Sequence, residues 1–102
     1  MIRLIEMLAP EYNTTLELLL SDNRSKYASR PRQIIMYVLS QATQESLLAI
    51  ANVFARRDHS CVVNAIKRVE QMMKKSASLR VQIEADVQRS KSLVKLLREV
   101  AA

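Results

Sequence analysis

The sequence contains no glycine, and this absence most limits the folds open to it. Loops that cradle phosphates, of the P-loop or dinucleotide-binding type, need several glycines and are therefore excluded. The only prolines are Pro10 and Pro31, and 49% of the residues are apolar although only three tyrosines and one phenylalanine are aromatic. A core built mostly from Leu, Ile, Val, Met and Ala is expected, and this composition indicates an all-α domain.

The charge of the chain is strongly basic and unevenly distributed. The formal net charge is +6, and residues 56–102 carry eleven basic and five acidic side chains against five of each in residues 1–55. This balance favours an anionic partner such as nucleic acid or an acidic membrane. Cys61 is the only cysteine and no apolar run approaches the roughly twenty residues of a membrane span. We therefore expect a cytoplasmic protein with no internal disulfide and no membrane partner.

Apolar residues at three- and four-residue spacing predict a series of amphipathic helices. Short helices are expected over residues 2–8 and from Thr14 or Thr15 to residue 20. A helix over 31–41 is expected to carry Pro31 in its first turn, after a basic loop from Arg24 to Arg30. Ser46 is expected to cap the next helix, over 46–54. A long final helix should open at Ser76 or Ser78 and reach about residue 100.

The segment after Asp58 is the most informative. Asp58 is a good N-cap residue for a helix that continues to about Lys75. Its apolar face consists of Val62, Ala65, Ile66 and Val69. A polar, basic face is left free, and a short polar turn separates this helix from the one over 46–54. Such a pair is typical of a helix-turn-helix whose second helix enters the DNA major groove.

These residues also resemble the C-terminal DNA-binding domain (domain IV) of the bacterial replication initiator DnaA. The run 57–65, Arg-Asp-His followed by Ser-Cys, an aliphatic pair, Asn and Ala, is similar to the signature of that family. The runs 24–26 and 30–33 resemble its basic loop. The family pattern can be laid over residues 12–87 without a gap, and 93–102 extend beyond it. The resemblance implies a single domain over 1–102, Trp-repressor-like in its helix-turn-helix, that lacks the ATPase part and is a stand-alone protein or a domain of a regulator.

The resemblance also implies which residues meet DNA. The position of Arg24 reaches the minor groove, and Arg32 with Gln33 contacts DNA at the start of a helix, where phosphate oxygens are favoured. His59 and Ser60 are expected at a phosphate or a base edge. The full set of candidate DNA-binding residues is Arg24, Lys26, Arg30, Arg32, Gln33, Arg56, Arg57, Asp58, His59, Ser60, Cys61 and Lys67.

Several of these candidates have a second interpretation. The basic run from Arg24 to Arg30 could be a solvated loop, and Arg57 could form only an ion pair with Asp58 that fixes the turn. Asp58 is a cap first and an acceptor for a cytosine amine second. Cys61 could act as a redox-sensing thiol at a helix N-terminus. Lys67 is the residue most expected to reach a phosphate on a basic face that otherwise includes Arg68, Lys74 and Lys75.

The chain departs from the family pattern at five positions. Ala55-Arg56 replaces a pair of glycines, so the turn must avoid positive φ angles or be strained. Ser40 replaces a phosphate-binding lysine, Leu48 replaces a proline, and Cys61 replaces a threonine. Cysteine is a poor hydrogen bonder, so a relaxed or altered target sequence is expected.

The leading hypothesis is a sequence-specific, nucleoid-associated binder of double-stranded DNA that regulates replication initiation or transcription at DnaA-box-like sites. No cofactor, metal, nucleotide or catalytic set is expected, since one histidine and one cysteine cannot assemble one. The alternative is a protein-interaction adaptor or homodimer that uses an apolar stripe on the last helix. That stripe consists of Leu93, Leu96, Leu97 and Val100. The same residues could instead fold back on Ile2, Ile5 and Leu8.

Overall fold

The computed structural model describes residues 1–101, with side chains for residues 1–100, so the end of the predicted extension over 93–102 lies outside the described residues. Within that part the chain is helical and has no strand, which confirms the all-α prediction. The elements are α1 (Ile2–Leu8), the 3-10 helix η1 (Ala9–Tyr12), α2 (Leu16–Leu20), α3 (Lys26–Ala42), α4 (Leu47–Val53), α5 (Ser60–Lys75) and α6 (Ala77–Ala101). No helix of this described part is long and apolar enough to cross a membrane.

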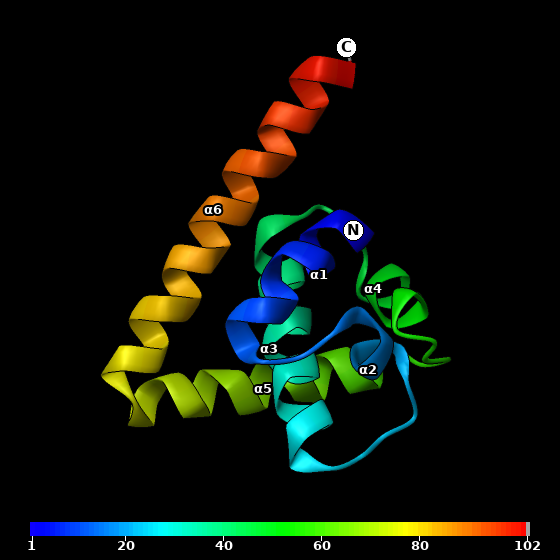
Figure 1. The fold of residues 1–102 in the computed structure, drawn as a ribbon, viewed down its shortest axis with the longest axis vertical. Coiled ribbons are helices and arrows are strands. Elements are labelled where there is room, and N and C mark those ends of the chain that lie inside the picture. Colours follow the sequence, from blue (N-terminus) through cyan, green and yellow to red (C-terminus); the bar gives the residue numbers. More distant parts are fainter. Residues whose placement is uncertain (102) are drawn as a thin grey trace.

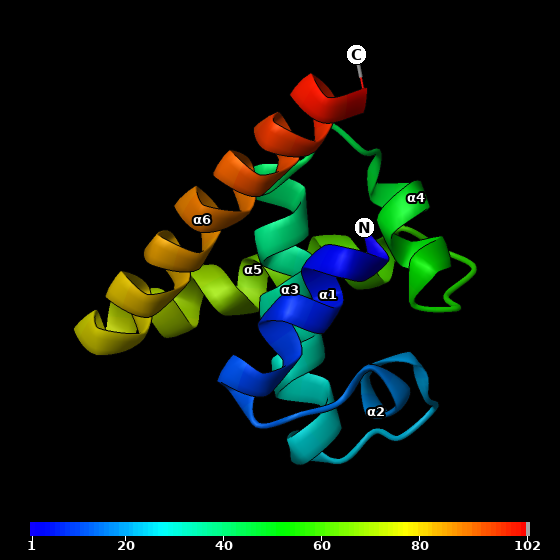
Figure 2. The same ribbon diagram turned by 45° about the horizontal axis from the view of Figure 1, so that its top comes forward.

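Helix α3 is the centre of the molecule, and the other helices are arranged around it (Figures 1 and 2). It buries Ile35, Val38 and Leu39 completely, because these residues recur at three- and four-residue spacing on one face. Helices α5 and α6 both pack on α3, and their fully buried contributions to the same core include Val69 and Ile83. The apolar faces of these helices therefore form a single hydrophobic core with α3 at its centre.

Polar side chains start three of the helices as the sequence predicts. The hydroxyl oxygens of Thr15, Ser46 and Ser76 each accept a hydrogen bond from the backbone N–H three residues later, at 3.2, 3.0 and 3.3 Å respectively. Each bond satisfies an amide that has no partner inside its helix, and such a cap stabilises a helix by about 1 kcal/mol. The predicted cap Ser46 is confirmed. Of the alternatives Thr14 or Thr15 and Ser76 or Ser78, the structure selects Thr15 and Ser76.

The beginning of α3 differs from the prediction. The helix begins at Lys26 rather than near Pro31, so Pro31 lies inside it and most of the expected basic loop is helical. The Ser25 carbonyl accepts the first helical hydrogen bonds, and Ala28 and Pro31 turn inward and are buried. Proline inside a helix leaves the carbonyl four residues earlier unpaired. That residue is Tyr27, which is 85% exposed, so water can reach its backbone.

The turn between α4 and α5 is strained. Helix α4 ends with the N–H of Arg56 donating to the carbonyl of Ala51 at 2.9 Å and the N–H of Ala55 donating to Asn52 at 3.0 Å. This is the Schellman pattern, which requires a left-handed residue, usually glycine, just beyond the helix. Ala55 adopts φ 58° there. The sequence left open a turn without positive φ angles or a strained turn, and the structure has the strained one. The left-handed conformation of Ala55 costs about 1 kcal/mol of stability.

Helix α6 lies along the body of the protein and its C-terminal end extends past α1 (Figure 1). Leu93 and Val94 pack against the core, whereas Leu96 is 55% and Val100 77% exposed. Leu97, at 38% exposure, lines a cavity of about 330 Å³ together with Met1 and Leu4, other residues of both ends of the chain, and two residues that follow α3. The folded-back arrangement therefore accounts for part of the apolar stripe and leaves the rest exposed.

Candidate nucleic-acid interface

The N-terminal half of α5 presents a polar ridge to solvent. His59, Ser60, Asn64 and Lys67 are all exposed, while Val62, Ala65 and Val69 on the opposite face are buried. Residues 60, 64 and 67 follow the spacing that places side chains on one helical face. The ridge is therefore a free surface at the end of the helix predicted to enter a DNA groove.

Asp58 fixes the start of this ridge. Its Oδ1 accepts a hydrogen bond from the N–H of Ser60 at 2.9 Å and lies 3.4 Å from Nδ1 of His59. The Cys61 thiol donates to the backbone carbonyl of Asp58 at 3.2 Å. Within the described residues Arg57 is exposed and makes no ion pair, so the Arg57–Asp58 pair considered from the sequence is absent there. The N-cap residue of α5 is His59, not Asp58 as predicted, and its side chain makes no capping hydrogen bond. The Asp58 carboxylate instead orients His59 and Ser60 from the preceding turn and leaves Arg57 available.

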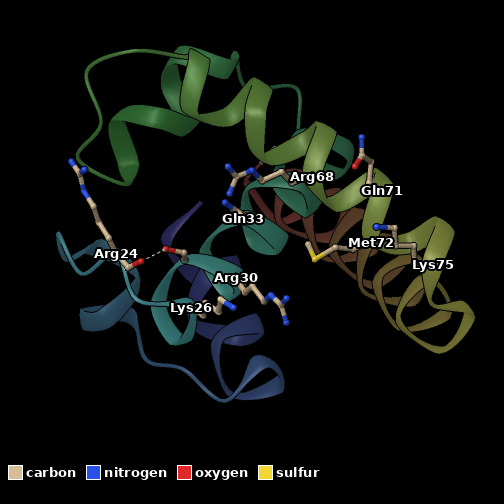
Figure 3. Close-up of a pocket in the computed structure, with 9 residues that line it drawn as sticks. Arg24, Lys26, Arg30, Gln33, Arg68, Gln71, Met72 and Lys75 are labelled. Atoms are coloured by element: carbon tan, nitrogen blue, oxygen red, sulfur yellow. Dashed lines mark hydrogen bonds between the residues drawn. The ribbon is translucent and has the colours of Figure 1, made fainter.

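A cavity of about 390 Å³ lies between the first turns of α3 and the second half of α5 (Figure 3). We call it the basic groove. Its lining residues are Arg24, Lys26, Ser29, Arg30, Gln33, Arg68, Gln71, Met72 and Lys75. Five of these are cationic and none is acidic, so the groove is a local concentration of positive charge that attracts anions.

A smaller hollow of about 140 Å³ adjoins the basic groove. Gln33 lines both, and Arg56 and Cys61 line the smaller one. The two segments that the sequence singled out, 24–33 and 56–61, therefore meet on one surface although residues 34–55 separate them in the chain. Gln33 marks the point where they join.

Arg32 is a correction to the sequence prediction. Its side chain is only 6% exposed, and its guanidinium donates to the backbone carbonyls of residues 18, 19, 21 and 23 at 2.8 to 3.1 Å. Four of its five N–H donors are used in this way. This geometry contradicts the expectation that Arg32 presents itself to a phosphate. Its role is to donate to backbone carbonyls at the end of α2 and in the following loop.

Arg56 stabilises the same loop from the other side. Its guanidinium lies 3.6 Å from the Asp22 carboxylate and donates to the Ser21 carbonyl at 3.4 Å, with 24% of the side chain exposed. Burial lowers the pKa of Arg32, and the nearby charge of Arg56 lowers it further. Arg32 thus attaches the loop that precedes α3 to that helix, and Arg56 attaches the same loop to the turn before α5 and remains only partly available to a ligand.

Arg68, Gln71 and Lys75 line the groove, although none of them was among the candidates from sequence. Arg68 and Lys75 are seven residues apart, which is two helical turns, so the sequence did contain a signal that they share a face. Lys67, which was the favoured residue, lies on the outer ridge and does not line the groove. The sequence could not show which side of α5 faces the start of α3, since that depends on packing.

A second charged cluster, between η1 and α6, was also missed. Tyr12 donates to the Asp86 carboxylate, and Arg89 pairs with Glu11 and, at 3.3 Å, with Asp86. Burial raises the pKa of Asp86, and burial followed by the bond to Asp86 raises the pKa of Tyr12. Burial acts to raise the pKa of Glu11 too, but hydrogen bonding with the neighbouring Asp86 and Arg89 side chains outweighs burial and lowers that pKa. Here charges are paired and serve to attach η1 to α6.

Comparison with known proteins identifies the family of this fold. Residues 2–69 match the family described as the bacterial DnaA protein helix-turn-helix. The chain belongs to this family. The match includes the basic groove's α3 side and the start of α5, so the resemblance seen in the sequence is confirmed.

Relatives of the DnaA family agree with this assignment. The chromosomal replication initiator proteins DnaA of Aquifex aeolicus and Rickettsia rickettsii are each 39% identical over 75 residues, which is 74% of this chain. The chain spans only 19% and 16% of those proteins. A solved structure described as a DNA replication initiation factor superposes with a TM-score of 0.78 at 31% identity, covering 89% of this chain and 28% of that one. The helix-turn-helix fold of the DnaA C-terminal domain is therefore shared.

Proposed function

We propose that this protein binds double-stranded DNA in a sequence-dependent manner through its helix-turn-helix. The N-terminal end of α5 enters the major groove, and Arg24 enters the adjacent minor groove, where the negative potential of narrow AT-rich DNA favours arginine. The observation that carries the proposal is that Cys61, which directly follows the exposed His59 and Ser60, lines a hollow that shares Gln33 with the carboxylate-free basic groove.

The proposal assigns different roles to the side chains of this surface. His59, Ser60 and Asp58 lie at the tip of α5, where a major-groove helix reads base edges, and Cys61 takes a neighbouring position with weak hydrogen-bonding capacity. Cations bind phosphates and set affinity rather than sequence preference. This second group consists of Lys26, Arg30, Arg57 and Lys67, with Gln33 as a neutral donor and Arg56 as a partly used one.

The target sites follow from the relatives. Two relatives are named as chromosomal replication initiators, so we propose DnaA-box-like sites and a role in regulating replication initiation or transcription from the nucleoid. Binding to such a box would let this protein compete with an initiator or recruit it. The replacement of threonine by Cys61 in the family pattern predicts a preference that differs from the initiator's own.

Titration of labelled duplexes tests the proposal. The protein is titrated against a duplex with a DnaA-type box and against a scrambled duplex, each at two salt concentrations. We expect tighter binding to the box, and affinity for both duplexes that falls steeply as salt rises, because cations of the protein displace counterions. Equal and salt-independent affinity for the two duplexes would contradict the proposal.

A second candidate function is protein contact through α6. Leu96 and Val100 are exposed and continue the line of Leu93 and Leu97 at helical spacing, so they form an apolar edge that the fold leaves uncovered. We propose self-association as its use. Sedimentation at increasing concentration should show a dimer that Leu96→Gln weakens, whereas a monomer at all concentrations would exclude this candidate.

A further inference from the structure

The basic groove is longer than the contacts assigned so far require. Arg24 lies toward one end of it and Lys75 toward the other (Figure 3). None of its five cationic side chains has an ion-pair partner among the described residues. Cations gathered without carboxylates repel one another, although water screens this repulsion, and an anion bound between them relieves it.

The shape of duplex DNA indicates which anion this is. A major groove and the minor groove next to it are separated by one sugar–phosphate strand. In the proposed complex the tip of α5 occupies the major groove and Arg24 the minor groove. That strand must therefore cross the protein surface between them, where Gln33 joins the smaller hollow to the basic groove.

We infer that the basic groove binds the sugar–phosphate strand that separates the two DNA grooves, and that Arg68 and Lys75 of α5 are phosphate-binding residues. Lys26 and Arg30 face them from α3 across the groove. The inference rests on the proposed function. It extends the contact from the base-reading tip of α5 to the C-terminal end of that helix.

The length of α5 gives the extent of this contact. Ser60 and Lys75 are fifteen residues apart, and at about 1.5 Å per residue they are roughly 22 Å apart along the helix axis. Lys75 therefore lies beyond the base pairs that Ser60 can reach and meets phosphates of the flanking duplex. We expect a flank on one side of the box to contribute affinity regardless of its sequence.

Charge-removing variants test the inference. Arg68→Gln and Lys75→Gln should each weaken binding about tenfold, the low end for a charge-assisted contact, equally for box and scrambled duplexes. Each should also reduce the salt slope by about one, because one phosphate contact is lost. Lys74→Gln is the matched control: it removes the same charge from the adjacent position, which lines a different hollow with Tyr37 and Glu70.

A duplex-length series provides a second measurement that does not depend on comparing variants of different stability. Trimming about five base pairs from one flank of the box should weaken wild-type binding, and trimming the other flank should not. The Arg68→Gln/Lys75→Gln double variant should respond to neither. All of these side chains are exposed, so thermal unfolding of the variants should match wild type.

Two results would overturn the inference. If Arg68→Gln and Lys75→Gln had the same salt slope as Lys74→Gln, no phosphate would lie in the groove. The same conclusion would follow if the double variant responded to flank length as the wild-type protein does. In both cases a retained box preference would leave the proposed function intact. If the wild-type protein showed no preference for the box over the scrambled duplex, the proposed function itself would be contradicted.

Discussion

The basic groove and the cluster between η1 and α6 use charge in opposite ways. The groove gathers five cations and no carboxylate, whereas the cluster surrounds Arg89 with Glu11, Asp86 and the Tyr12 hydroxyl. Asp86 is 5% exposed and needs these partners, because a buried charge without them is strongly unfavourable. The groove cations are solvated and need none. Unpaired charge therefore marks the surface available to a ligand, and paired charge marks the part that fixes the fold.

Arg32 shows that position alone does not decide which use an arginine has. It lies in sequence among the groove residues, yet its donors are occupied by backbone carbonyls. Arg32→Gln should therefore destabilise the protein by about 3 kcal/mol, since several buried acceptors lose charged donors. Urea unfolding measures this. Arg30→Gln, on an exposed neighbour, is the control and should leave the free energy of unfolding within about 0.5 kcal/mol of wild type.

A second prediction tests the opposite property at the tip of α5. His59→Ala should weaken binding to the box by about 1–3 kcal/mol, the range for a specific contact. It should have little effect on the free energy of unfolding, because His59 is exposed and its side chain makes no capping hydrogen bond. A fluorescence titration and a urea melt of the same variant separate the two effects. Unchanged box affinity with a lowered unfolding free energy would show that this histidine is structural.

The η1–α6 cluster predicts a pH effect on stability. The pKa of Tyr12 is raised in the folded state, so the unfolded chain loses its proton first as the pH rises. The stability from this group is fully present below the unfolded pKa of about 10 and is lost above it. Tyr12→Phe should be less stable at pH 7 by about 1 kcal/mol, because the bond to Asp86 is lost. The difference should shrink as pH rises from 9.5 to 11 in urea unfolding. A constant difference over that range would mean that Tyr12 ionises freely in the fold.

The smallest predicted effect concerns the turn beside the candidate interface. Ala55→Gly should stabilise the protein by roughly 0.5 kcal/mol, because relief of the left-handed strain exceeds the entropy cost of glycine. Ala85→Gly is the control on an exposed, right-handed stretch of α6 and should destabilise by about 1 kcal/mol. Both values come from urea unfolding. Destabilisation by Ala55→Gly would show that its methyl group makes a contact worth more than the strain.

Local chemistry was enough to predict most of the helices. Three- and four-residue apolar spacing predicted α1, α4, α5 and α6, and the hydroxyls of Ser46 and Ser76 predicted two starts, because a cap acts on amides a few residues away. The start of α3 was predicted too late. Pro31 argued against an earlier beginning, and the burial of Ala28 and Pro31 against the rest of the fold outweighed that local preference.

By itself, then, the sequence determined an all-helical chain, the ridge on α5 and an excess of positive charge, since these depend on composition and on periodicity within a segment. Tertiary structure decided which charges are used and which are free. It buried Arg32 under the end of α2, placed Arg68 and Lys75 opposite the start of α3, and enclosed Asp86 with Tyr12 and Arg89. Those outcomes depend on how distant segments pack, and the pattern along one helix carries no information about the neighbour that will cover it.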